Sequence, residues 1–266
     1  MPDDKKPGFS RDSISNTLIV AIGVSLVCSV LVSAAAITLR PLQEANQNEF
    51  RQRIVLEVAG LYDPDQPIDE QFGNIETRLV DLDTGEYVQE MDPQGFDAEA
   101  AANDPELGVR IPKDKDIAGL NRRAAYAPVY VVKDGDDIQQ YILPVRGKGL
   151  WSTLYGYLSV APDGNTVAGL RFYEHAETPG LGDKIEQEAW LAQWEGKKLY
   201  DEQGNPQMKV ARGTVQPGPD AIHRVDGLSG ATLTANGVTY LIQYWTGSHG
   251  FGPYLANLSS EANDNG

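Results

Sequence analysis

Asp-Gly-Leu-Ser-Gly-Ala-Thr, residues 226–232, is the stretch that decides how this chain is interpreted. From Ala231 to Trp245, apolar residues recur at spacings of three and four, which predicts a helix with one apolar stripe. Ser229 precedes this pattern and is a residue type that often caps helix N-termini. Thr232 is therefore expected in the first helical turn. Free backbone N–H groups and the helix dipole favour a phosphate there by about 0.3–1 kcal/mol.

The stretch resembles the D-x-x-S/T-G-A-T sequence on which a flavin transferase attaches FMN to a threonine through a phosphoester bond. The resemblance implies that Thr232 carries FMN and that Asp226 is the residue that the transferase recognises. Ser229, Gly230 and Ala231 would surround the phosphate, since the two small residues leave room beside the backbone. The alternative is a helix that merely begins at this point. Asp226 and the motifs below argue against that alternative.

The N-terminal part of the chain predicts a membrane anchor. No charged residue occurs from Ser13 to Leu39, and the apolar run 18–39 exceeds the ~20 residues that cross ~30 Å of hydrocarbon as a helix. We expect a short cytoplasmic N-terminus at 1–16 and a transmembrane helix at 17–39. The alternative is a signal peptide cleaved near 33–36, but the apolar region of such peptides is usually ~7–15 residues long. Positive charges flank both ends of the run, so the positive-inside rule does not orient it.

Composition excludes several classes of function. The net charge is −16, all of it after the apolar run, which argues against binding to nucleic acid. Cys28 is the one cysteine, so an intrachain disulfide, a four-cysteine iron–sulfur site and a C-x-x-C-H haem attachment are excluded. The three histidines lack metal-ligand spacing, and we expect no metal site.

The remainder of the chain predicts an α+β domain with a mixed, mainly antiparallel sheet. We expect a helix that continues to about residue 53, and short strands and loops over 76–125. Further along, a helix is expected at 183–194, a Gly/aromatic loop at 247–255 and a disordered tail at 259–266. The expected strands are 126–132, 140–145, 154–160, 166–173, 198–200 and 208–211. The turn Ala-Pro-Asp-Gly-Asn between the third and fourth of these strands predicts a hairpin.

Two further glycine-bearing segments are candidates for contact with a ligand. Residues 175–182, His-Ala-Glu-Thr-Pro-Gly-Leu-Gly, lie between a predicted strand and a predicted helix, where backbone N–H groups can approach a ligand. Residues 147–151, Gly-Lys-Gly-Leu-Trp, end in an aromatic ring that could stack on a flavin for ~0.5–1.5 kcal/mol. Each segment alone would be interpreted as a turn or as core packing. The candidate residues are Trp151, His175, Glu177, Thr178, Gly180 and Leu181.

Together with Gly-Phe-Gly-Pro-Tyr-Leu-Ala-Asn-Leu at 250–258, these motifs resemble the NqrC family, the C subunit of the Na⁺-translocating NADH:quinone reductase. The similarity covers nearly the whole chain. It implies an extracytoplasmic FMN-binding domain over 40–258, on the periplasmic side of a bacterial inner membrane. Glu177 and Thr178 would hydrogen-bond the flavin ring, and Trp151 and Leu181 would lie around it.

The resemblance also implies the partners of the chain. They are five other subunits, of which B, D and E are the closest redox partners, and a flavin transferase for maturation. NADH would be the ultimate donor to the complex and ubiquinone the acceptor. The FMN would relay electrons between a membrane iron–sulfur centre and another covalent FMN in the B subunit. The chain would carry electrons without catalytic residues of its own.

Two alternatives remain at this point. The G subunit of Rnf ion-translocating complexes shares the flavinylation sequence, but it is generally shorter and lacks the ending seen at 250–258. The other alternative is a membrane-anchored binding or structural domain without a cofactor.

Overall fold

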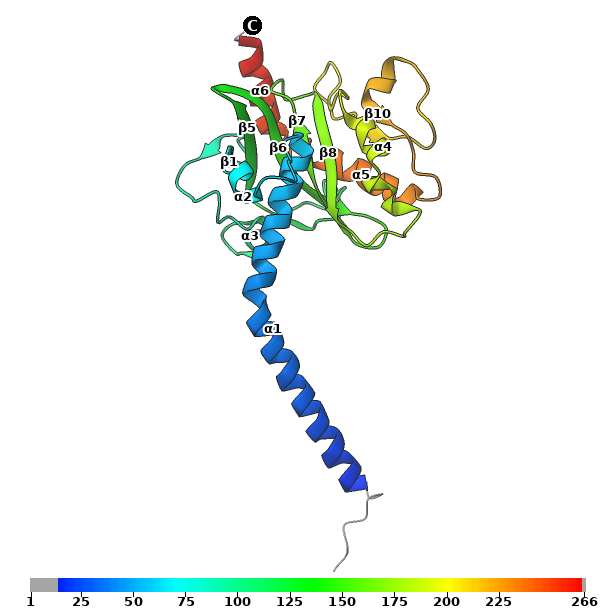
Figure 1. Cartoon of the computed structure of the whole chain (residues 1–266). Helices are drawn as coiled ribbons and strands as arrows, with labels where there is room; N and C mark the ends of the chain where they lie inside the picture. The colour runs from blue at the N-terminus through cyan, green and yellow to red at the C-terminus, as the bar shows by residue number, and fades with distance from the viewer. Residues whose placement is uncertain (1–13, 265–266) are drawn as a thin grey trace, which may run out of the picture. The chain divides into compact units, whose positions relative to one another are not determined.

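The computed structural model describes residues 14–264 (Figure 1), which divide into two compact units at Phe50/Arg51. Helix α1, Ile14–Ala59, contains the predicted span 17–39 and continues beyond the predicted end near residue 53. Among the described residues, α1 is the one helix long and apolar enough to cross a membrane. Most of the predicted N-terminus, residues 1–13, lies outside the described part of the chain.

The last turns of α1 belong to the core of the second unit. Ile54, Val55 and Leu56 are buried, as are Val58 and Ala59. They pack in one cluster with residues of the sheet that include Val132, Ile142 and Tyr157. Burial of these apolar side chains explains why the helix extends to Ala59.

The second unit is built on a six-stranded antiparallel sheet in the order β2-β1-β5-β6-β7-β8. Its strands are β1 (Ile75–Asp81), β2 (Tyr87–Val88), β5 (Tyr126–Asp134), β6 (Asp137–Lys148), β7 (Thr153–Val160) and β8 (Val167–Glu174). The four longer strands predicted from 126 onward are confirmed, including the hairpin of β7 and β8. The α+β class is also confirmed.

Alternation along the strands divides the core between the two faces of the sheet. Val131, Leu143 and Leu158 contribute to the larger cluster, which also contains buried residues of α5 (Thr232–Trp245) and α6 (Gly252–Asp264). The intervening residues of the same strands contribute to the cluster around the end of α1. The sheet is therefore covered on both faces.

Smaller elements complete the unit. The region 76–125 supplies β1 and β2 to the main sheet, and its other elements lie outside that sheet. The remaining elements before β5 are α2 (Ile68–Phe72), α3 (Ala98–Asn103), and the paired strands β3 (Gly108–Arg110) and β4 (Arg122–Ala124). Later in the chain, β9 (Lys209–Val210) pairs in parallel with β10 (Arg224–Val225), which follows the 3₁₀ turn η3 (Pro219–His223).

Three local predictions differ from the structure. The helix predicted at 183–194 is broken into η1 (Gly182–Glu186), α4 (Glu188–Leu191) and η2 (Ala192–Trp194). The segment 198–200 forms only isolated bridges, Thr166 with Lys198 and Tyr200 with Pro206. The strand expected at 208–211 is reduced to β9.

The largest correction concerns the C-terminus. Helix α6 begins inside the Gly/aromatic loop expected at 247–255 and continues through the predicted disordered tail as far as Asp264. Its buried residues Tyr254, Leu255 and Leu258 recur at helical spacing, and Phe251, just before the helix, is buried as well. The Tyr254 hydroxyl lies 2.7 Å from the hydroxyl of Tyr87. Residues 265–266 lie outside the described residues.

Candidate functional site

The N-terminus of α5 presents Thr232 to solvent. Thr232 is the first helical residue, and its side chain is exposed. Ala235 N–H donates to the Ala231 carbonyl (3.0 Å), so the N–H groups of residues 232–234 precede this first intrahelical bond. Ser229, the predicted cap, is exposed and does not cap the helix. The N-cap residue is Ala231, and no side chain caps the helix end.

The backbone before Thr232 forms a tight turn. Gly230 has φ +79°, a left-handed conformation that glycine adopts without strain. Leu228 and Ala231 on either side are buried, and Ala231 N–H donates to the Leu228 carbonyl (3.0 Å). A methyl group placed on Gly230 would lie 2.8 Å from Cδ2 of Leu181. The turn therefore contacts the 175–182 loop, as expected for a shared site.

Glu177 joins three segments at one buried carboxylate. Its side chain is 4% exposed. The Thr234 hydroxyl of α5 donates to Oε2 (2.5 Å), and the backbone N–H of Trp151 donates to Oε1 (3.0 Å). The structure shows protein donors at both carboxylate oxygens, and the hydrogen bond expected from a flavin ring to Glu177 stays a prediction. The carboxylate holds the protein segments together.

The same contacts determine the protonation of Glu177. Burial alone would raise the pKa of the carboxyl group. The hydrogen bond from Thr234 and those from the backbone N–H groups of residues 150–152 outweigh burial, and the net pKa is lowered. Glu177 is thus an anionic anchor at neutral pH.

Glycines permit this convergence. A methyl group on Gly149 would lie 2.5 Å from Oε1 of Glu177, and one on Gly182 would lie 2.9 Å from the Thr234 hydroxyl. A methyl group on Gly237 in α5 would lie 2.7 Å from the Lys148 carbonyl. These close approaches explain physically why glycine occupies these positions in the two motifs and in α5.

Trp151 lies outside the core, contrary to the interpretation that it packs inside. Its side chain is 69% exposed, and its Nε1 donates to the Thr178 hydroxyl (3.0 Å). The Thr178 carbonyl accepts the N–H groups of Leu181 (3.1 Å) and Gly182 (3.0 Å), and Gly180, just before Leu181, has φ +75°. Thr178 thus orders its own loop and fixes the indole ring of Trp151.

His175 braces the loop from inside. Its Nδ1 accepts the backbone N–H of Glu177 (3.1 Å), so the neutral ring carries its proton on Nε2. Nε2 faces Oε1 of Glu186 at 2.9 Å, and the ring is nearly buried. The structure therefore gives His175 a role within the protein.

Sequence reasoning missed several residues of the site. Thr234 is a buried partner of Glu177, and Gly149 lies close to the Glu177 carboxylate, whereas Leu150 and Leu233 are exposed apolar side chains. Leu233, expected on the buried stripe of α5, is 60% exposed. The helical spacing does place Thr234 in line with buried Val238 and Leu241, and this signal could have identified it.

Asp226 is held by its neighbours rather than projecting freely. Its Oδ1 accepts the backbone N–H of Val215 (2.6 Å). Its own N–H donates to Oε1 of Gln193 (2.9 Å), and its carbonyl accepts Nε1 of Trp190 (2.8 Å). These contacts connect the acceptor stretch to the loop before η3 and to the α4–η2 segment.

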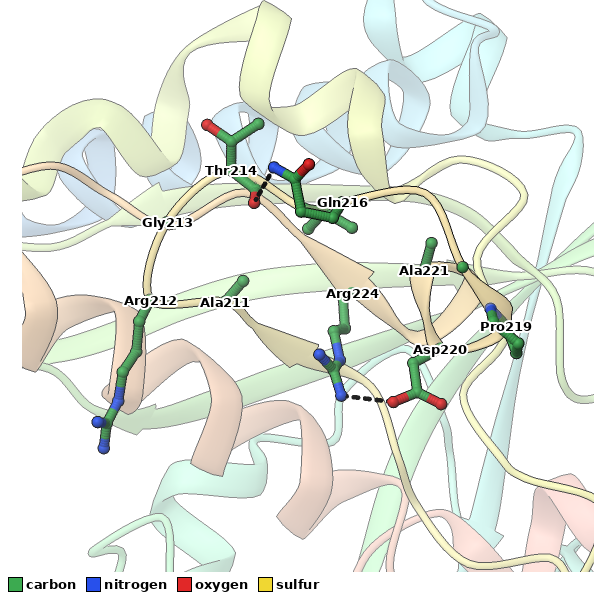
Figure 2. A pocket seen from close by; sticks show the side chains of 11 residues that line it. Ala211, Arg212, Gly213, Thr214, Gln216, Pro219, Asp220, Ala221 and Arg224 are labelled. Carbon is green, nitrogen blue, oxygen red and sulfur yellow. Dashed lines mark hydrogen bonds and ion pairs between the residues drawn. The ribbon is translucent and has the colours of Figure 1, made fainter.

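The loop bonded to Asp226 also borders a hollow of about 490 Å³ (Figure 2). The hollow is lined by residues 211–216, 218–221 and Arg224. Arg224 is paired with Asp220 at 2.6 Å, as the dashed line in Figure 2 shows. None of the predicted site residues lines this hollow, so it is a separate feature from the Thr232 site.

Similarity to known proteins identifies the family. The C subunit of the Na⁺-translocating NADH-quinone reductase from Neisseria meningitidis serogroup A is 47% identical over 254 residues, which cover 95% of this chain and 97% of that relative. The chain belongs to the NqrC family. The C subunit of the same reductase from Vibrio vulnificus is also 47% identical, over 94% of this chain and 97% of its own length.

Solved structures agree with this family. The crystal structure of NqrC from Shewanella oneidensis matches with a TM-score of 0.75 and 38% identity, over 81% of this chain and 99% of that chain. The crystal structure of the C subunit from Parabacteroides distasonis matches with a TM-score of 0.64 and 26% identity, over 82% and 96% of the two chains.

The FMN-binding domain model matches residues 149–247. This range contains the acceptor stretch and every predicted residue of the ring site. The match argues against the domain without a cofactor, and membership of the NqrC family decides against the Rnf alternative.

Proposed function

We propose that this chain is the electron-carrying NqrC subunit of a Na⁺-translocating NADH:ubiquinone reductase, with FMN bound covalently to Thr232. The observation that carries the attachment site is the exposed Thr232 hydroxyl at the uncapped first turn of α5. Backbone N–H groups there can bind a phosphate without displacing a side-chain cap. The nearby Thr234 hydroxyl is buried against Glu177 and is unavailable for attachment.

The surroundings of Thr232 fit a flavin. Leu181 contacts Gly230 beside the acceptor, and Trp151 and Leu150 expose apolar surface on the segment that Glu177 ties to α5. When bound, the isoalloxazine ring supplies one-electron transfer. The residues of the chain orient the ring, desolvate one side of it and leave it accessible to a partner. A covalent bond retains the cofactor without deep enclosure.

The attachment reaction is a redox-neutral group transfer from FAD. The Thr232 hydroxyl oxygen attacks the phosphorus on the FMN side of the diphosphate. A new oxygen–phosphorus bond forms, the bond to the AMP phosphate breaks, and AMP leaves with the hydroxyl proton. The positive end of α5 stabilises the phosphate of the product.

Location and partners follow from the family and from α1. We infer that residues 1–16 are cytoplasmic, that 17–39 span the bacterial inner membrane, and that 40–258 form the periplasmic FMN domain. Five other subunits would complete the complex, with B, D and E closest in the redox chain. Electrons would pass between a membrane iron–sulfur centre and the covalent FMN of the B subunit, from NADH as ultimate donor to ubiquinone.

The attachment site is tested by coexpressing the full chain with a flavin transferase and measuring intact mass. Thr232→Ala should abolish the FMN adduct. Thr234→Ala should retain it, although loss of the bond to Glu177 will lower stability. An adduct that survives Thr232→Ala would overturn the assignment.

A further inference from the structure

We propose that Asp226 is a positioning residue: it holds the acceptor stretch in a conformation that can be flavinylated, by bonding the backbone of Val215. On this proposal the transferase does not read the Asp226 carboxylate directly. The inference rests on covalent attachment of FMN at Thr232, as proposed above. It assigns to the first residue of the stretch a role inside the fold.

Asp226 is already bonded within the chain. Its Oδ1 lies 2.6 Å from the Val215 N–H, a short bond for a backbone donor and a carboxylate. Its backbone N–H and carbonyl are bonded to Gln193 (2.9 Å) and Trp190 (2.8 Å). A partner protein that bonded Oδ1 would have to compete with the bond to Val215.

The bond from Val215 extends a backbone ladder. Val225 of β10 pairs with Val210 of β9, and Ala211 N–H donates to the Val225 carbonyl (2.8 Å). Beyond Asp226, Gly227 N–H donates to the Gly213 carbonyl (2.9 Å). The two segments are so close that a methyl group on Gly227 would lie 2.4 Å from the Ala211 carbonyl. Val215, two residues beyond Gly213, is bonded by the Asp226 carboxylate instead of by a backbone carbonyl. The side chain thus extends the pairing of the two segments to Val215.

The chain between Asp226 and Thr232 is short and partly buried. It is held at buried Leu228 and buried Ala231, whereas Ser229 and Gly230 are exposed. The turn that precedes α5 is therefore supported by buried Leu228 and Ala231 and, before them, by the bond from Val215 to Asp226. Without the bond at Asp226, the left-handed turn at Gly230 would lose part of its support, and the Thr232 hydroxyl would no longer be held in one orientation.

The proposal predicts that position 226 needs a hydrogen-bond acceptor, and that the charge of the acceptor is secondary. Asp226→Asn keeps an oxygen that can accept the Val215 N–H, whereas Asp226→Ala removes it. Val215→Pro removes the donor and leaves the carboxylate in place. Asp220→Ala is the matched control, because Asp220 lies nearby in η3 and has a 74% exposed side chain that pairs with Arg224 at the surface.

The experiment measures the rate of FMN incorporation into the full chain by intact mass, with flavin transferase and FAD. A hydrogen bond to a charged group is worth about 1.5–3 kcal/mol, so Asp226→Ala and Val215→Pro should each slow the reaction roughly ten- to hundredfold. Asp226→Asn should react about fivefold faster than Asp226→Ala, since a neutral hydrogen bond retains about 1 kcal/mol. Asp220→Ala should react normally. The proposal would be overturned if Val215→Pro incorporated FMN at the parent rate. It would also be overturned if Asp226→Asn incorporated FMN as slowly as Asp226→Ala.

Hydrogen exchange decides the result if Val215→Pro fails to fold. In Asp226→Ala, amides of residues 213–216 should exchange faster than in the parent, together with the loss of labelling. Lost labelling with unchanged exchange would show that the carboxylate is read directly. Failure of the parent chain to gain FMN at Thr232 would instead reject the proposed function, so the two failures are distinguishable.

Discussion

The Thr234 hydroxyl lies 2.5 Å from Oε2 of Glu177, a residue that precedes it by 57 positions. Thr232, two residues earlier on the same helix, is exposed. Because successive helical residues are rotated by roughly 100°, the side chains of the two threonines point to nearly opposite sides of α5. One presents a hydroxyl to solvent, and the other fastens the helix to the 175–182 loop.

This relationship predicts a large effect on stability for Glu177→Gln. The amide must place an N–H₂ group where the carboxylate accepts hydrogen bonds from Thr234 and from the Trp151 backbone. Leaving a buried polar group unsatisfied costs about 1–3 kcal/mol, so the free energy of unfolding in urea should fall by that amount.

Glu174→Gln is the control for charge alone, because Glu174 is exposed three residues earlier. A surface substitution of this kind should change the free energy of unfolding by less than about 0.5 kcal/mol. If the two variants were equally stable, the carboxylate of Glu177 would not anchor α5 to the loop.

A pH dependence follows from the same group. The pKa of Glu177 is lowered from its ordinary value of 4.5, so the folded state favours the carboxylate more than the unfolded state does. The contribution of Glu177 to the free energy of unfolding is therefore fully present above pH 4.5, and it is lost as the pH falls through the lower pKa that this group has in the folded protein. Unfolding midpoints measured from pH 7 downward should fall more steeply for the parent than for Glu177→Gln. Parallel curves would contradict the lowered pKa.

The site illustrates what local sequence can and cannot predict. The helix from Thr232 to Trp245 and the β7–β8 hairpin follow from apolar spacing and turn residues, which are local signals. The tie between Glu177 and Thr234 joins distant segments, and a pattern of single residues does not specify such a pair. For this reason the sequence alone does not predict that Glu177 is buried among protein donors, which the structure shows.

The error at Ser229 has a similar cause. Capping preference alone favours serine over alanine. The left-handed turn at Gly230 places the N-cap at Ala231 instead and leaves the serine exposed. The wrong prediction at the C-terminus has a different cause. The apolar residues of α6 already show helical spacing in the sequence, but the glycines, the proline and the polar residues among them favour the prediction of a loop and a disordered tail.

Thr178→Ala should alter the environment of the flavin more than the stability of the protein. The substitution removes the hydroxyl that accepts the hydrogen bond from Trp151 Nε1. This bond is exposed, so it contributes only about 0.5–1.5 kcal/mol to the free energy of unfolding. The variant should acquire covalent FMN but show a shifted flavin absorbance or midpoint potential. Trp151→Phe keeps an aromatic ring and removes the same donor, so it should shift the spectrum in the same direction. An unchanged spectrum and potential in folded, flavinylated Thr178→Ala would show that the loop is structural and does not contact the ring.

Helix α6 should be essential to the fold. Leu255 is fully buried in the larger core cluster, so Leu255→Ala should lower the free energy of unfolding by about 2–5 kcal/mol. Ala256, the next residue, is exposed, and Ala256→Ser should change stability by less than about 0.5 kcal/mol. Urea denaturation measures both. A disordered C-terminal segment would instead give two variants of equal stability.

The N-terminal span should be retained in the mature protein as a membrane anchor. Its apolar run is longer than the ~7–15 residues usual for a signal peptide, and it lies in one continuous helix with the buried apolar residues between Ile54 and Ala59. Mass analysis of the mature chain should therefore find residues 1–36, and alkaline carbonate should not release the protein from membranes.

A shortened chain that begins at Ile37 keeps every residue that is buried within the described range 14–264, since the first of these is Ile54. It should be released from membranes with an unchanged thermal midpoint and covalent FMN content, which separates anchoring from folding. A natural mature chain that begins at Ile37 would show that the run is a cleaved signal peptide.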